Sequence, residues 1–203
     1  MPPRVKKPTD IRELATVEVS RLIALASRIS PETWGQEDRH KENDFAVFHH
    51  TQHLVFRFIS ENRDPEDFYA NPAWDVWKPV LMPLMQQAIA PYGFRNPQFP
   101  KAMLAKLAAG HQIDPHYDGA GSNQRVHKIH IPLVTNPEAE FLVGDGRFHL
   151  DVGKAYEVNN IISHGAVNQG SEDRIHFIFE VFEGDYQQTT VRPDGGTAAN
   201  ADL

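Results

Sequence analysis

The feature that most constrains the fold is a change of hydrophobic periodicity near residue 103. From there to residue 182, apolar residues form short strand-like runs separated by glycines and by Asn136-Pro137. The predicted strands are 103–109, 112–117, 126–134, 139–143, 147–150, 155–158 and 175–182. Many short strands at regular turn spacing indicate an antiparallel sandwich or barrel.

The preceding part of the chain has the apolar spacing of two helices, over 10–28 and 73–90. Two short strands, 45–48 and 54–58, are predicted between them, and the residues 49–53 either line a cavity mouth or form a polar turn. Helices followed by a strand-rich half predict an α+β fold. We expect a double-stranded β-helix, a jelly-roll or cupin-like barrel, with the N-terminal helices packed on one sheet. An unspecified α+β sandwich is the alternative.

The chain of 203 residues has the length of one domain. Residues 1–9 are rich in proline and lysine and are predicted to be a flexible arm. A single folded domain is expected over 10–187, with a helical N-terminal part at 10–91 and a barrel core at 103–182. Residues 188–203 have the composition of a disordered tail.

Composition narrows the class of protein further. The formal net charge of -7 argues against nucleic acid and anionic membranes as partners. The absence of cysteine excludes disulfides, iron–sulfur clusters and a thiol nucleophile. No apolar run approaches the ~18 residues of a membrane span, and the N-terminus has no apolar core typical of a secretory signal. We therefore expect a cytoplasmic protein, whose oligomeric state the sequence leaves open.

Histidine placement suggests a metal site. A ferrous oxygenase centre uses two imidazoles and one carboxylate, which leaves positions open for a bidentate co-substrate and dioxygen. His and Asp two apart on a strand share a face and can supply two of these ligands. With 11 histidines and 27 acidic residues such triplets also arise by chance, and the chain has three, which begin at His40, His116 and His149.

Spacing distinguishes the three triplets. A barrel that binds a dicarboxylate co-substrate also needs a cation on the strand after the last histidine ligand. Only His53 and His164 have an arginine ten residues later, Arg63 and Arg174. The triplet at 40–42 is too close to His53, and the one at 149–151 is too close to His164, for several strands to intervene. The triplet at 116–118 leaves that room before His164.

At these positions the chain resembles a known family. The stretches MLAKLAAGHQIDPHYDG, RVHKIHIPLV and VNNIISHGAVNQGSEDRIHFIFEVF, within 103–182, resemble the aspartyl/asparaginyl β-hydroxylases, a family of Fe(II)- and 2-oxoglutarate-dependent oxygenases. The family includes bacterial hydroxylases of free amino acids. The resemblance implies that His116, Asp118 and His164 ligate Fe(II) and that Arg174 binds the distal carboxylate of 2-oxoglutarate.

The resemblance also assigns three further residues. A family Arg-x-His pair that contacts the co-substrate falls on Lys128 and His130, where lysine keeps the charge but lacks the bidentate fork of arginine. The family's substrate contact falls on Asn160, an aspartate in the animal enzymes. Asp118 stands where the animal enzymes have glycine. These differences argue against the animal enzymes' substrate for this chain.

The main functional hypothesis is a non-haem Fe(II)- and 2-oxoglutarate-dependent dioxygenase. It would use O2 to hydroxylate a C–H bond of an amino acid, free or in a peptide or protein, or of a related small metabolite, with release of succinate and CO2. The alternatives are a jelly-roll metal-binding protein and a cupin enzyme that uses no keto acid. Neither of these needs Arg174, so this residue discriminates between the hypotheses.

Overall fold

The structure is a computed structural model that describes residues 2–39, 41, 45–119 and 121–185. In chain order its helices and strands are β1 (Ile11–Thr16), α1 (Ser20–Ala26), α2 (Pro31–Asp38), η1 (Ala46–Phe48), β2 (Thr51–Ile59), η2 (Ser60–Asn62), β3 (Phe68–Ala70), α3 (Ala73–Ile89), η3 (Ala90–Tyr92), β4 (Pro97–Leu107), β5 (His111–His116), η4 (Ser122–Gln124), β6 (His127–Val134), β7 (Ala139–Val143), β8 (Gly146–Phe148), β9 (Lys154–Val158), β10 (His164–Asn168) and β11 (Arg174–Glu183).

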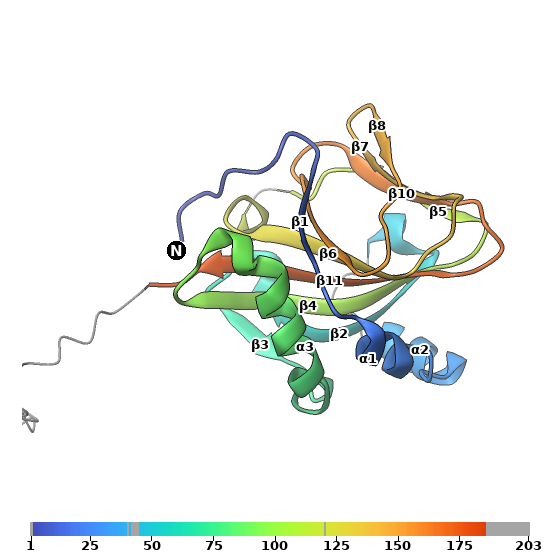
Figure 1. Ribbon diagram of the computed structural model, residues 1–203, viewed down its shortest axis with the longest axis horizontal. Coiled ribbons are helices and arrows are strands. Elements are labelled where there is room, and N and C mark those ends of the chain that lie inside the picture. Colours follow the sequence, from blue (N-terminus) through green and yellow to red (C-terminus); the bar gives the residue numbers. More distant parts are fainter. Residues whose placement is uncertain (1, 40, 42–44, 120, 186–203) are drawn as a thin grey trace, which may run out of the picture.

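Two antiparallel sheets form the barrel. The larger has seven strands in the order β1-β9-β6-β11-β4-β2-β3, and the smaller has four in the order β5-β10-β7-β8. Figure 1 shows the smaller sheet standing against one end of the larger one. Apart from the consecutive pairs β2-β3 and β7-β8, neighbours in both sheets come from distant parts of the sequence, as in a double-stranded β-helix. The predicted fold class is therefore confirmed.

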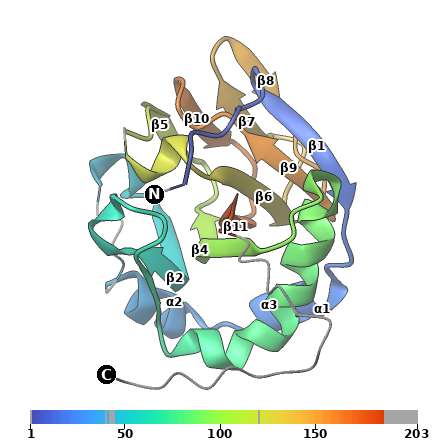
Figure 2. The same cartoon turned by 90° about the vertical axis from the view of Figure 1, so that its left-hand side faces the viewer.

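The helices cover the outer face of the larger sheet (Figure 2). Helix α3 contacts β1 and β2, α2 contacts β2, and α1 contacts β6. Pro79 and Pro83 both lie inside α3, which continues through them as one helix. The largest apolar core lies between these helices and the sheet and includes Trp74, Leu81 and Met85 of α3.

Strand β11 shows how one segment serves both the core and the cavity. Successive side chains of a strand point to opposite faces. Ile175, Phe177, Phe179 and Val181 belong to the core under the helices. The alternate residues Arg174, Ile178 and Glu180 line a cavity between the two sheets. The polar residues of this apolar strand are therefore placed on its inner face by register alone.

We expect Phe177→Ala on β11 to be strongly destabilising. Phe177 is fully buried, so its truncation should lower the free energy of unfolding by about 3–5 kcal/mol. Urea denaturation followed by circular dichroism measures this loss. Val76→Ala on α3 is the control, because Val76 is 76% exposed and should change stability by no more than about 0.5 kcal/mol. Equal losses in the two variants would contradict this description of the core.

The N-terminal part differs from its prediction. The helix predicted over 10–28 is wrong in its first half, where β1 pairs antiparallel with β9. The apolar spacing there suits a helix, but pairing with β9, which is distant in the sequence, satisfies the backbone instead. The strand predicted over 45–48 is also wrong, since η1 occupies it. The part 10–91 is thus a mixture of helices and strands.

Residues 2–9, predicted as a flexible arm, lie against the barrel. The Val5 amide donates to the Gln124 carbonyl (2.9 Å), and Lys7 Nζ donates to the Val126 carbonyl (2.7 Å). These long-range bonds fix the segment beside η4 and β6. The predicted disordered tail, 188–203, lies outside the described residues. In the part of the chain that is described, no helix is long and apolar enough to cross a membrane.

Candidate metal centre

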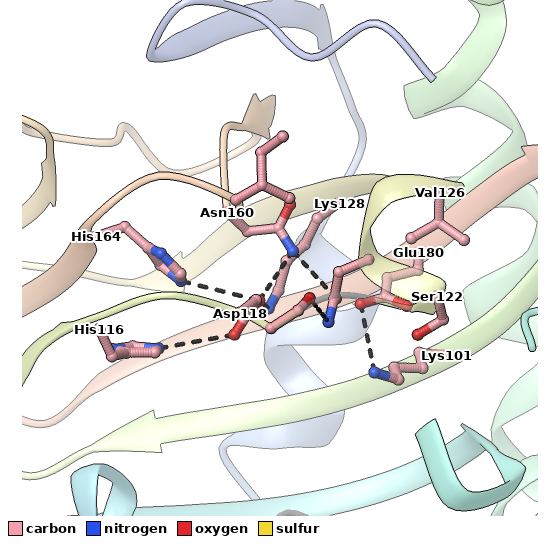
Figure 3. A network of polar contacts seen from close by, with 12 residues as sticks. Lys101, His116, Asp118, Ser122, Val126, Lys128, Asn160, His164 and Glu180 are labelled. Atoms are coloured by element: carbon pink, nitrogen blue, oxygen red, sulfur yellow. Dashed lines mark hydrogen bonds and ion pairs between the residues drawn. The ribbon is translucent and has the colours of Figure 1, made fainter. Parts of the chain in front are cut away.

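Three predicted ligands meet at the open end of the smaller sheet. His116 ends β5 and His164 begins β10, and the two are cross-strand partners. Asp118 follows β5, and its backbone amide donates to the Asn160 carbonyl (3.0 Å). One ligand atom from each of His116, Asp118 and His164 lies within 4.8 Å of the others. Figure 3 shows both imidazoles directed toward the Asp118 carboxylate.

Backbone carbonyls orient both imidazoles. His116 Nδ1 lies 2.8 Å from the Asp114 carbonyl oxygen, and His164 Nδ1 lies 3.0 Å from that of Ile162. A carbonyl can only accept, so Nδ1 donates in each ring, which leaves Nε2 as the nitrogen that can face a metal. The two Nε2 atoms lie 3.8 Å from the Asp118 carboxylate oxygens. Both rings therefore present a metal-ligating nitrogen on the same side as the carboxylate.

Electrostatics keeps Asp118 and His164 in their ligating forms. Burial alone would raise the pKa of Asp118, but Lys128, His164 and hydrogen bonds from Lys128 and Asn160 outweigh it and hold the pKa well below its usual range. Burial, with Lys128 nearby, lowers the pKa of His164 to about 4. Near neutral pH the site thus combines a carboxylate with a neutral imidazole at His164, the forms that bind Fe(II).

Asp118 is held by two neighbours. Lys128 Nζ lies 2.5 Å from Asp118 Oδ2, and Asn160 Nδ2 donates to the same oxygen (2.9 Å). Asn160 is fully buried, and its Oδ1 accepts from Lys7 Nζ (2.6 Å) while its Nδ2 also reaches Asn123 (3.1 Å). The predicted substrate contact therefore has its polar atoms engaged within the protein. In this arrangement Asn160 orients the carboxylate.

Replacing Asn160 with alanine is expected to weaken metal binding about 10–100-fold, the usual cost of losing an outer partner of a ligand. The reason is that Asp118 loses its hydrogen bond from Nδ2 and can rotate. Calorimetric titration with Ni(II) measures the effect. Gln112→Ala on the same strand as His116 is the control, since its side-chain amide donates to the exposed Asp114 side chain and not to a metal ligand. Unchanged affinity in Asn160→Ala would contradict this orienting role.

The three ligands open onto a cavity of about 590 Å³ between the sheets. This volume lies in the range typical of small-molecule sites. The other predicted functional residues Lys128, His130 and Arg174 line the same cavity. Their side chains come from the inner faces of β6 and β11, as the strand alternation requires.

Arg174 is a buried cation without an acidic partner among the described residues. It is 6% exposed, and its Nη2 lies 2.9 Å from Nδ1 of His176. Burial lowers the pKa of Arg174 to about 9, and it also lowers that of His176 well below its usual range. A guanidinium beside a neutral imidazole in a cavity needs an anion to offset its burial. A ligand carboxylate would supply that charge.

His130 and Lys128 are in different situations. His130 is buried, and its Nε2 has no hydrogen-bond partner among the described residues. Burial, with Lys128 and Arg174 nearby, lowers the pKa of His130 well below its usual range. A neutral ring with an unused nitrogen can bond a ligand in the cavity. Lys128 instead contacts the Asp118 carboxylate, so its charge is paired with a predicted metal ligand.

The histidine-rich segment 49–53 divides between two environments. His53 is 4% exposed and lines the cavity. Burial, with Lys41 nearby, lowers its pKa to about 4. The rings of His49 and His50 contact each other in a tilted arrangement (3.9 Å between ring centroids), and neither residue lines the cavity. The two interpretations of this segment therefore each describe a part of it.

Sequence reasoning missed two cavity residues, Lys101 and Glu180, and also His176, which contacts the cavity residue Arg174. His176 escaped notice because it stands in an apolar strand two residues after Arg174. Lys101 and Glu180 are far apart in the sequence and meet across paired strands. A charged residue at inward positions of an otherwise apolar strand was the available signal for Glu180.

A double-stranded β-helix that brings two histidines and an aspartate together at one cavity defines the class of non-haem iron oxygenases. The sequence model described as aspartyl/asparaginyl beta-hydroxylase matches residues 73–183, more than half of the chain. The chain belongs to this family. It is a 2-oxoglutarate-dependent dioxygenase of the hydroxylase kind, whose cofactors are Fe(II), 2-oxoglutarate and O2. The metal-binding and cupin alternatives are thereby set aside.

Solved structures share the fold at low sequence identity. A 2OG-Fe(II) oxygenase family oxidoreductase from Burkholderia pseudomallei matches with a TM-score of 0.55 and 14% identity, over 82% of this chain and 78% of that one. The viral collagen prolyl hydroxylase of Paramecium bursaria Chlorella virus-1, solved with 2-oxoglutarate, matches with a TM-score of 0.51 and 10% identity, over 85% and 96%. No curated protein matches the sequence significantly.

Proposed function

We propose that this enzyme hydroxylates a C–H bond of an amino acid, free or within a peptide or protein, or of a related small metabolite, and that it does so in a single domain over 10–187. The proposal assigns the iron to His116, Asp118 and His164 and the distal carboxylate of 2-oxoglutarate to Arg174. The observation that carries it is a buried arginine that has no acidic partner among the described residues and lies in the same cavity as the three ligands.

The donor set fits a ferrous ion. Two imidazole nitrogens and one carboxylate oxygen on one side leave the opposite side to other ligands. When bound, iron, 2-oxoglutarate and dioxygen together supply the oxidising chemistry, with conversion of the keto acid to succinate and CO2. The protein groups bind and orient. Lys128 and Asn160 hold Asp118 in place, and the carbonyls of Asp114 and Ile162 fix the two rings.

Arg174 and His130 form the expected co-substrate end of the cavity. Ile178 and Glu180 continue the inner face of β11 toward the other end, and Met103 lies across from Ile178 on β4. Apolar side chains, among them Phe58, line this part. The wall excludes water from a reacting C–H bond and leaves room for a substrate of amino-acid size.

The proposed function is tested by oxidation of a substrate panel. The Fe(II)-loaded protein is supplied with 2-oxoglutarate, oxygen and, separately, free amino acids, short peptides and amine-free metabolites. We expect succinate to form above the substrate-free level with at least one amino acid or peptide, whose mass rises by one oxygen atom. Arg147→Ala, exposed on β8 and outside the cavity, is the control for protein handling. Stimulation by amine-free metabolites alone would overturn the amino-acid assignment.

A further inference from the structure

The end of the cavity beyond the metal ligands contains three charged side chains on adjacent strands, Lys128, Glu180 and Lys101, which we call the ionic row. Glu180 of β11 pairs in register with Lys128 of β6 on one side and with Lys101 of β4 on the other. All three side chains line the cavity. In Figure 3, Glu180 and Lys101 lie on the side of Asp118 away from the two histidines. Lys128, in contact with Asp118, connects this row to the metal centre.

Glu180 has an unused oxygen. Its Oε1 lies 3.6 Å from Lys101 Nζ, whereas its Oε2 is buried without a hydrogen-bond donor among the described residues. Glu180 is only 1% exposed. A buried carboxylate oxygen that lacks a donor is costly, and such groups are ordinarily satisfied. The cavity is the place from which a donor can come.

Lys101 has capacity for an acceptor. Its Nζ donates to Asn62 Oδ1 (2.5 Å), is paired with Glu180, and lies 4.7 Å above the ring of Phe58. An ammonium group has three N–H donors, and these contacts use two of them. Lys101 is 7% exposed. A carboxylate in the cavity can take the remaining donor.

We infer that Glu180 and Lys101 form a subsite for a free α-amino acid, with its ammonium group on Glu180 Oε2 and its carboxylate on Lys101 Nζ. The two charges of an α-amino acid are separated by one carbon atom, so they can pair head-to-tail with the Glu180–Lys101 ion pair. Within a peptide chain both groups are amides and lack these charges. This inference rests on the proposed function, and it restricts the substrate to the free form.

The position of the subsite suits the reaction. Lys128 contacts Asp118 at one end and neighbours Glu180 across the sheet. A small molecule anchored at Glu180 is therefore close to the metal ligands, because Lys128 connects Glu180 to Asp118 in this arrangement. The apolar Phe58, Met103 and Ile178 flank this space. The side chain of the bound amino acid can extend along these three apolar residues toward the metal centre, while Arg174 remains available to the co-substrate.

The test is a binding experiment on protein loaded with Ni(II) in place of iron and with 2-oxoglutarate. The Ni(II)-loaded protein does not turn over, so binding is measured alone. Calorimetry measures the affinity for each proteinogenic L-amino acid in three forms: free, N-acetylated, and as the central residue of a Gly-X-Gly peptide. We expect at least one free amino acid to bind, and N-acetylation to weaken it on the order of 100-fold, the cost of losing a buried charged partner. Glu180→Gln should weaken the free amino acid similarly.

Two further variants keep the result interpretable. Glu180→Asp keeps the charge between the two lysines but withdraws the carboxylate from the cavity, so it should fold and still bind the amino acid more weakly. Glu61→Gln removes an exposed carboxylate beside Asn62 and should bind as the unmodified protein does. In every variant the affinity for 2-oxoglutarate should stay within about twofold, because Arg174 is untouched.

Three results would overturn the subsite. They are equal affinity for free and N-acetylated amino acids, unchanged affinity in both Glu180 variants, and no binding of any free amino acid by protein that holds 2-oxoglutarate normally. Failure of the metal-loaded protein to bind 2-oxoglutarate would instead refute the proposed function. The two failures are therefore distinguishable.

Discussion

Replacing His164 with alanine is expected to abolish substrate-dependent succinate formation, with a loss well beyond the ~100-fold that follows removal of an outer partner of a ligand. The imidazole supplies one of three donor atoms that lie within 4.8 Å of one another. Removal leaves two donors, too few to fix the ion on one face. Succinate release at saturating Fe(II) measures the effect, and calorimetry with Ni(II) measures the accompanying loss of metal affinity.

The matched control is His149→Ala. His149 belongs to the third His-x-Asp triplet, and its Nε2 lies 3.9 Å from Asp151 outside the cavity. It should retain activity within about twofold, because exposed polar groups away from a site contribute little. Undiminished turnover in His164→Ala, or an equal loss in His149→Ala, would contradict the assignment of the ligands.

Arg174→Ala is expected to raise the KM for 2-oxoglutarate on the order of 100-fold or more. The reason is that truncating one partner of a buried charge pair costs about 2–5 kcal/mol, and each 1.4 kcal/mol is tenfold. Arg174→Lys should fall between, because lysine keeps the charge but not the bidentate geometry. Steady-state kinetics in 2-oxoglutarate at saturating substrate measures both variants.

Arg147→Ala serves as the control for arginine removal. Arg147 of β8 pairs with Glu140 of β7, and the two side chains are 53% and 32% exposed. A surface pair of this kind is worth little. Its KM for 2-oxoglutarate should match that of the unmodified protein. A KM unchanged in Arg174→Ala would show that the co-substrate's distal carboxylate binds elsewhere.

Most strands of the strand-rich half were predictable because each is marked by a local sequence pattern, an apolar run between turn residues. Strands β6, β7, β9 and β11 lie within two residues of the predicted ranges, since each is an apolar run between turn residues. Strand β10 was not predicted. Its sequence, His164–Asn168, contains small and polar residues, and it is a strand because β5 and β7 pair with it on both sides. Pairing partners distant in sequence decide such elements.

The candidate site divides in the same way. His116 and Asp118 are two residues apart, and Arg174 follows His164 at fixed spacing, so their grouping could be read from the sequence. The Lys101–Glu180 pair depends on the register between β4 and β11. No local pattern specifies that register. The environment of Asn160 likewise depends on Lys7 from the N-terminal segment, which composition alone suggested would be flexible.

Anaerobic titration of the Fe(II)-loaded protein with 2-oxoglutarate tests the central claim most directly. A keto acid chelated to ferrous iron gives a weak visible charge-transfer band at about 500 nm. We predict that the band appears in the unmodified protein, is absent in His164→Ala, and needs far more 2-oxoglutarate in Arg174→Ala. Absence of the band in unmodified protein that demonstrably holds Fe(II) would contradict the assignment of this cavity as a 2-oxoglutarate-dependent iron site.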